Sequence, residues 1–119
     1  MIKSYEDLEV YQESYRLYIE IYKATISLPR YETYEMVNQL RRASLSIVLN
    51  IAEGYGKQSV ADFKRFLSIS IGSCNEVCVI LNLLKDLEYI KVSNYTIWKE
   101  RYTILGKRLY RLRETWEKL

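Results

Sequence analysis

The last quarter of the chain carries an apolar repeat that constrains the fold more than any other feature. The repeat alternates spacings of four and three residues: Trp98, Tyr102, Leu105, Leu109, Leu112 and Trp116. This alternation is typical of a helix that packs lengthwise against another helix. The chain has one proline and four glycines in 119 residues, too few turn residues for a fold of many short strands. We therefore expect long helices.

Four segments have helical periodicity, and we predict helices over residues 5–27, 32–53, 60–87 and 95–118. Short connections make successive helices antiparallel neighbours. The sequence therefore predicts one all-α domain over residues 1–119, an antiparallel up-down-up-down four-helix bundle.

The expected helix ends follow from local chemistry. Ser4 with Asp7, and Ser59 with Asp62, have capping-box spacing, and Ser93 or Asn94 is expected to cap the last helix. Pro29 should end the first helix, and Gly54 and Gly56 should end the second in left-handed conformations. Gly72, in the middle of the third helix, predicts a close approach between helices.

A polar stripe runs along the second predicted helix, at spacings of three and four: Gln39, Arg42, Ser46, Asn50 and Glu53. Folding the third helix back on the second predicts pairs between Arg42 and Glu76, and between Arg65 and Asn50 or Glu53. A partly buried charge needs such a partner. We interpret Arg42, Asn50, Glu53, Arg65 and Glu76 as a structural polar network that fixes helix register. The alternative is that Arg41, Arg42 or Lys57 also faces a partner or an RNA phosphate.

The residue types exclude most catalytic chemistry. The chain has no histidine, so it lacks His bases, His metal ligands and His-activated nucleophiles. Two cysteines do not complete a zinc site, and Cys74 and Cys78 are expected to be reduced core residues. Glu53 and Glu76 have expected arginine partners, which do not raise a carboxyl pKa. We expect no enzymatic activity, metal or cofactor, and no small-molecule substrate is evident.

The ends and the hydropathy of the chain predict its location. The N-terminus has no apolar signal region, and no run approaches the roughly 20 apolar residues that span a bilayer. We expect a cytoplasmic protein with no membrane contact.

Positive charge is concentrated in the last predicted helix. Residues 95–119 hold seven basic and three acidic residues, a net charge of +4, whereas the whole chain is +3. Arginine is the preferred partner of phosphate. The candidate nucleic-acid-binding residues are Arg101, Lys107, Arg108, Arg111 and Arg113, with Arg41, Arg42 and Lys57. The alternative is a solvated face that keeps the bundle soluble.

The chain is rich in tyrosine, with twelve residues, four of them on one stripe of the first predicted helix: Tyr11, Tyr15, Tyr18 and Tyr22. A second apolar stripe on that helix includes Leu17 and Ile21. One domain cannot easily cover both stripes. We therefore predict a homo-oligomer.

Two runs resemble a known family: QLRRASLSIVLNIAEGYGKQS, and FKRFLSISIGSCNEV after it. They are similar to the bacterial four-helix-bundle proteins encoded in intervening sequences of 23S ribosomal RNA. The opening DLEVYQESYRL and the closing DLEYI are similar too. The family pattern often has proline near position 48 and glycine at 35 and 88, where this chain has Val48, Glu35 and Glu88.

The resemblance implies a four-helix bundle that assembles into a homopentameric ring. A related protein is the accessory variability protein of diversity-generating retroelements, whose basic pentamer engages a reverse transcriptase and its template RNA. By this resemblance, the expected partners are a second copy of the chain, RNA or DNA, and a reverse transcriptase.

Two functions stay open from the sequence. The first is a non-enzymatic homo-oligomeric scaffold that binds structured RNA or a ribonucleoprotein through its basic surface, as a reverse transcriptase accessory. The alternative is a protein-interaction module that docks a partner protein without touching RNA.

Overall fold

The computed structural model describes residues 1–28 and 30–117, and leaves the side chains of residues 30–33 undescribed. A short 3-10 turn, η1 (Tyr5–Asp7), precedes four helices: α1 (Glu9–Thr25), α2 (Arg30–Gly56), α3 (Val60–Asp86) and α4 (Val92–Thr115). The expected roles of Pro29 and Lys118 fall outside the described residues. Over the described chain there are helices and no strands, so the all-α expectation is confirmed.

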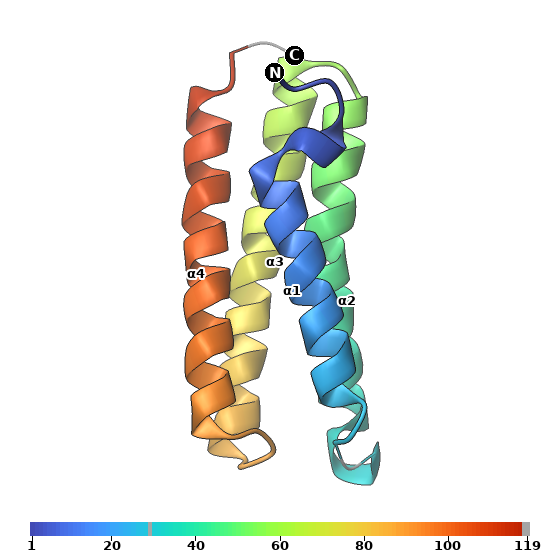
Figure 1. Ribbon diagram of the computed structural model, residues 1–119, viewed down its shortest axis with the longest axis vertical. Helices are drawn as coiled ribbons and strands as arrows, with labels where there is room; N and C mark the ends of the chain where they lie inside the picture. Colours follow the sequence, from blue (N-terminus) through green and yellow to red (C-terminus); the bar gives the residue numbers. More distant parts are fainter. Residues whose placement is uncertain (29, 118–119) are drawn as a thin grey trace.

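The four helices run alternately up and down, and η1 lies at the same end of the bundle as the end of α4 (Figure 1). The bundle is elongated, about 45 × 21 × 20 Å. Helix α3 packs against α2 and α4, and α1 packs mainly against α2 with a lighter contact to α4. Helices α2 and α4 therefore lie on opposite sides of the bundle. The pentamer expected from the resemblance stays a prediction.

The N-terminal capping box is confirmed, but it caps η1 rather than a long helix. Ser4 Oγ accepts from the Glu6 backbone N–H, and Asp7 Oδ2 accepts from the Ser4 backbone N–H at 3.1 Å. Leu8 then adopts an extended conformation (ψ 126°), and its side chain is almost fully buried. The extended backbone at Leu8 directs its own side chain into the core and separates η1 from α1. The helix expected from residue 5 therefore begins only at Glu9.

The connection between α2 and α3 differs from the expected glycine stop. Helix α2 continues through Gly56, and no described glycine has a positive φ. The left-handed residue is Gln58 (φ 55°), and Ser59 then caps α3 by accepting from the Asp62 backbone N–H. The expectation of left-handed glycines at Gly54 and Gly56 is wrong, because the turn lies two residues later.

Gly54 instead allows a close approach between α2 and α3. A Cβ atom at this position would lie 2.5 Å from the Cβ of Phe66, closer than packed atoms can come. Gly72 was expected to have this role, and that expectation is wrong. It is exposed, and a Cβ there would meet nothing within 4 Å.

The end of α3 and the start of α4 were placed to within a few residues. Helix α3 ends in a Schellman motif, in which Tyr89 N–H donates to Leu84 O and Glu88 N–H donates to Lys85 O, both at 2.9 Å. Glu88 takes the left-handed conformation of this motif (φ 64°). Helix α4 begins at Val92 after Lys91, without a side-chain cap, so the expected caps at Ser93 and Asn94 are wrong.

The core is made of one face of each helix. Its fully buried side chains include Leu17, Ile21, Leu40, Ile47, Ile51, Phe63, Leu67, Leu81, Leu105 and Leu109. On α1 the stripe with Leu17 and Ile21 is covered, whereas the stripe with Tyr15 and Tyr22 is exposed together with Ile19 and Ile26. One protomer therefore covers only one of the two apolar stripes that the sequence places on this helix.

Helix α3 is long and apolar enough, by composition, to cross a membrane. The expectation that no segment approaches this limit was therefore too strong. Its N-terminus is capped, its inward face forms part of the core, and 44% of its most apolar window is buried inside the bundle. Length and composition alone are therefore weak evidence for a membrane span, because helices that form bundle cores pass the same test.

Candidate nucleic-acid interface

The polar stripe of α2 reaches α3 through other residues than those expected. Gln39 Nε2 donates to Glu76 Oε1 at 2.6 Å, while Arg42 is exposed and pairs with no described residue. Arg65 pairs with Asp62 on its own helix at 3.4 Å. The expected pair of Arg42 and Glu76 is therefore absent, because Gln39 lies one turn earlier on the same stripe and takes the carboxylate.

The rest of the stripe is held by neutral groups. Asn50 Nδ2 donates to Ser46 O at 2.8 Å and to Ser46 Oγ at 3.0 Å, within α2. Ser73 Oγ on α3 lies 3.0 Å from Ser46 Oγ, and Ser70 Oγ donates to Ile47 O at 3.1 Å. Glu53 is exposed and 4.0 Å from Lys57, so neither Asn50 nor Glu53 pairs with Arg65 as expected. The hydroxyls of Ser70 and Ser73 and the side-chain amide of Gln39, rather than pairs of arginine with glutamate, join α2 to α3.

The orientation of α4 about its own axis decides which of its basic residues face a neighbouring helix and which face solvent. Trp98, Tyr102, Leu105 and Leu109 are buried, which confirms the predicted seam from Trp98 to Leu109. Helix α4 ends at Thr115 and Trp116 is extended, so the expectation of a helix that continues past Trp116 is wrong. The basic residues of α4 lie on two flanks and an outer face. One flank is directed toward α1 and the other toward α3. The basic residues of α4 therefore fall into more than one environment.

Arg101 lies on the α1 flank and ties the two helices together. Its guanidinium donates to Glu13 Oε1 at 3.0 Å and to Glu20 Oε2, both on α1. Burial alone would lower the pKa of Arg101, but these hydrogen bonds outweigh it and the pKa is raised. Arg101 is a structural cation with both carboxylates in place, so it is a poor candidate for binding phosphate.

Arg113 and Arg41 are engaged in a similar way. Arg113 lies on the α3 flank, where it donates to Ser68 Oγ at 2.9 Å and to Glu114 Oε1 at 3.2 Å. Arg41 joins α2 to α1: its Nε donates to Thr25 Oγ1 at 3.0 Å, and its guanidinium stacks 4.2 Å from the centre of the Tyr22 ring. Both side chains are held by the bundle itself.

Three cations of α4 remain free. The side chains of Lys107, Arg108 and Arg111 are exposed and form no hydrogen bond or ion pair with any described residue. Arg111 lies three residues after Arg108 and four after Lys107, so it is a neighbour of both on the helix surface. We call these three residues the α4 basic face. Arg42 is equally free but lies on α2, across the bundle, and Lys57 lies at the α2–α3 connection.

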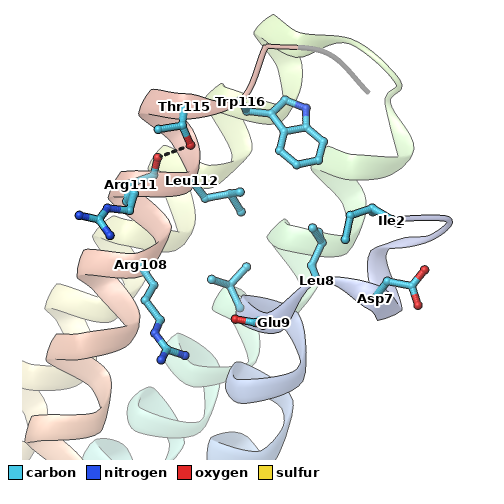
Figure 2. A pocket seen from close by; sticks show the side chains of 10 residues that line it. Ile2, Asp7, Leu8, Glu9, Arg108, Arg111, Leu112, Thr115 and Trp116 are labelled. Carbon is cyan, nitrogen blue, oxygen red and sulfur yellow. Dashed lines mark hydrogen bonds between the residues drawn. The ribbon is translucent and has the colours of Figure 1, made fainter.

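A pocket of about 510 Å³ borders this face, between the start of the chain and the end of α4 (Figure 2). Its floor is apolar, formed by Leu8, Val10, Leu112 and Trp116. Arg108 extends along α4 on the side that faces Glu9, and Arg111 lies on the outer side of the helix, directed away from the pocket (Figure 2). The volume lies within the range of pockets that hold small ligands. Sequence reasoning missed this site, because it joins residues about 100 positions apart.

Trp116 is fixed in place at the top of the pocket. Its ring packs edge-on against Phe63, with 5.0 Å between centroids, and against Tyr55 at 6.4 Å. Its backbone N–H donates to Leu112 O at 3.0 Å, which ends α4. Trp116 is half-buried and is one of the residues that line the pocket. It is a rigid aromatic surface beside two free arginines.

No arrangement for catalysis is found in the part of the chain that the structure describes. There, no group of three or more acidic or cysteine side chains could hold a metal ion. Cys74 is buried, and burial raises the pKa of its thiol to about 12, so it is not a nucleophile at neutral pH. Cys78 lies 3.8 Å from Thr103 Oγ1 and forms no disulfide.

The fold and the surface define a class of protein: an all-α bundle with a basic outer helix. A family model described as the 23S rRNA-intervening sequence protein matches residues 6–111. The chain therefore belongs to the family of 23S rRNA-intervening sequence proteins, and the resemblance found in its sequence is confirmed.

A solved structure agrees with this assignment. It is the 1.70 Å crystal structure of a protein of unknown function from the S23 ribosomal protein family of Bacteroides thetaiotaomicron VPI-5482, and it matches with a TM-score of 0.78. The two chains are 29% identical, and the match covers 89% of this chain and 96% of the other. Among curated proteins, none matches this chain significantly.

Proposed function

We propose that this protein is a non-enzymatic scaffold that binds nucleic acid through the α4 basic face. The observation that carries the proposal is the contrast among its basic residues. Arg41, Arg101 and Arg113 are held by partners, whereas Lys107, Arg108 and Arg111 share one exposed face without any described partner. Free cations release counterions when they bind phosphate, and engaged ones must first break their own contacts.

Assembly of several copies would strengthen the binding of nucleic acid, because a single α4 basic face carries only three free cations. The exposed stripe of α1, formed by Tyr15, Ile19, Tyr22 and Ile26, is a candidate contact between copies. A closed ring, such as the pentamer implied by the resemblance, would repeat the basic face around an axis and add up its field. RNA is the favoured nucleic acid because of the family, and a reverse transcriptase is a candidate partner. We place this scaffold in the cytoplasm.

Filter binding of a structured RNA over a salt series tests the proposal. We expect binding at low salt that weakens steeply as salt is added, and a slope that is lower by about one unit in Arg111→Gln. The matched control is Arg113→Gln, which removes the same charge from the engaged α3 flank. An RNA affinity that is absent at low salt, or equally reduced by both variants, would contradict the proposal. Native mass spectrometry with and without RNA reports the number of copies and the bound RNA together.

A second function is favoured by the same exposed stripe. If Tyr15, Ile19, Tyr22 and Ile26 contact another protein rather than a second copy, the chain is a protein-interaction module. Ile19→Glu places a charge at the centre of the stripe and distinguishes the two cases. For the scaffold it yields monomers that bind RNA more weakly. For the module it leaves the number of copies unchanged and abolishes capture of the partner, a reverse transcriptase being the first to test.

A further inference from the structure

The pocket between the N-terminal segment and the end of α4 combines three kinds of surface. It has an apolar floor, a fixed aromatic ring, and charged groups of both signs at its rim. From this combination we propose that the pocket takes one unpaired nucleobase of a single-stranded RNA segment, with the neighbouring phosphate on Arg108. This inference rests on the proposed function and assigns it a site and a preferred substrate.

The first argument is the aromatic ring. Bases stack on aromatic side chains, and each such contact contributes about 1–3 kcal/mol without regard to sequence. Trp116 packs edge-on against Phe63 and Tyr55, so its ring is already held and loses little conformational freedom when a base stacks on it. Leu112 lies below it (Figure 2), and Val10 is another apolar residue that lines the pocket.

The second argument is the distribution of charge around the opening. Arg108 stands on the α4 side of the opening, unpaired, where a phosphate next to the bound base would lie, and Arg111 lies on the outer side of the same helix (Figure 2). Two acidic residues lie on the other side. Asp7 is already engaged, since its carboxylate accepts from the backbone N–H groups of Lys3 at 2.8 Å and Ser4 at 3.1 Å.

The free carboxylate selects among possible ligands. Glu9 has no described partner and lines the pocket opposite the arginines. A carboxylate accepts hydrogen bonds from the N–H groups on the edge of a base. It repels any anionic group on its own side of the pocket, so the phosphate of a bound nucleotide must lie on the arginine side. A nucleotide can meet the ring, the cations and the carboxylate together, with the base edge toward Glu9 and the phosphate toward Arg108.

The pairing state of the nucleic acid follows from the shape of the site. In a duplex both faces of each base are covered by its neighbours and its edge is paired, so a base cannot enter the pocket without leaving the stack. A single strand, a loop or a bulge offers the base at no such cost. We expect the protein to prefer an unpaired strand over the same strand annealed to its complement by at least about fivefold.

Tryptophan fluorescence reports on the pocket directly, because the chain has two tryptophans and Trp98 is buried in the core. Trp98→Phe leaves Trp116 as the reporter in the full chain. We expect a short unstructured RNA to quench its emission, and the annealed duplex to quench it less. If Trp98→Phe does not fold, the difference between wild type and Trp116→Phe gives the same signal.

Matched charge variants complete the test. Arg108→Gln should weaken binding of the unpaired RNA by about tenfold and reduce the quenching, while Arg113→Gln, on the α3 flank, should change affinity by less than about threefold. RNA binding that leaves Trp116 emission unchanged would overturn the pocket but not the basic face. Absence of any RNA binding would overturn both. Quenching by an acidic peptide with an apolar side chain, and not by RNA, would show that the pocket is a peptide site.

Discussion

The seam between α2 and α3 and the seam between α1 and α4 are built on different principles. The first is closed by small groups: Gly54 against Phe66, and Ser46 against Ser73. The second is bridged by the long side chain of Arg101, and opens into a pocket toward the end of α4. Tight packing leaves no room for a ligand, whereas a seam held by long charged side chains leaves free surface beside them. The first seam therefore fixes the fold, and the second is available to a partner.

The largest expected change in the free energy of unfolding is at the seam between α2 and α3. Gly54→Ala puts a methyl group 2.5 Å from the Cβ of Phe66, an atom that no rotamer change can move away. Overpacking of this kind outweighs the gain in helix propensity, so we expect the free energy of unfolding to fall by about 2 kcal/mol. Urea unfolding followed by circular dichroism measures the change.

Gly72→Ala is the matched control for that variant. A methyl group there meets nothing within 4 Å and replaces glycine in the middle of α3. It should raise the free energy of unfolding by up to about 1 kcal/mol. Equal effects of the two alanines would show that α2 and α3 are not in close contact at Gly54.

A smaller change in stability is expected at the seam between α1 and α4. A double-mutant cycle of Arg101→Gln and Glu13→Gln removes one ion pair between α4 and α1, whose side chains are 31% and 24% exposed. Partial exposure screens the charges, so we expect a coupling energy of about 1 kcal/mol that decreases with added salt. Zero coupling at low salt would mean that Arg101 does not hold this seam and is free to bind phosphate.

A substitution in the connection between α3 and α4 should change the stability by a similar or smaller amount. Glu88 adopts φ 64° in the Schellman motif, a conformation that a side chain disfavours and glycine adopts freely. Glu88→Gly should therefore stabilise the protein by about 0.5–1 kcal/mol, as a shift in the urea midpoint. A loss of stability would show that the Glu88 side chain makes a contact worth more than the strain. The prediction also explains why the family pattern often has glycine at this position.

The last prediction concerns the reactivity of the two thiols, Cys74 and Cys78, and involves no change in stability. Burial raises the pKa of Cys74 to about 12, whereas Cys78 is half-buried on the neighbouring turn. At pH 8 we expect iodoacetamide to modify one thiol in the folded protein, Cys78, and both thiols after denaturation, as counted by mass spectrometry. Rapid modification of Cys74 would mean that the seam between α3 and α4 opens.

Much of the fold could be predicted from the sequence, because helical periodicity depends on neighbours along the chain. The seam from Trp98 to Leu109, the cap at Ser59 and the existence of all four helices needed no tertiary information. The glycines were misjudged for a physical reason. A glycine that permits close packing and a glycine that adopts a left-handed turn look alike in sequence, and Gly54 and Gly72 differ only in what lies opposite them.

The candidate site could be predicted only in part. The sequence put positive charge on the last helix, but it could not separate Lys107, Arg108 and Arg111 from Arg101 and Arg113. The difference is the presence of Glu13, Glu20 and Ser68 on neighbouring helices. For the same reason the expected pair of Arg42 with Glu76 was wrong, since Gln39 competes for the same carboxylate.

The sequence by itself determined that this chain forms long amphipathic helices, has no histidine chemistry, and belongs with the 23S rRNA-intervening sequence proteins. Only the tertiary structure decided which cations are free, which glycine is indispensable, and that Leu8 and Trp116 meet Arg108 in one pocket. Periodicity and residue type are local properties of a chain. The environment of a side chain depends on residues far away in sequence, which folding alone brings beside it.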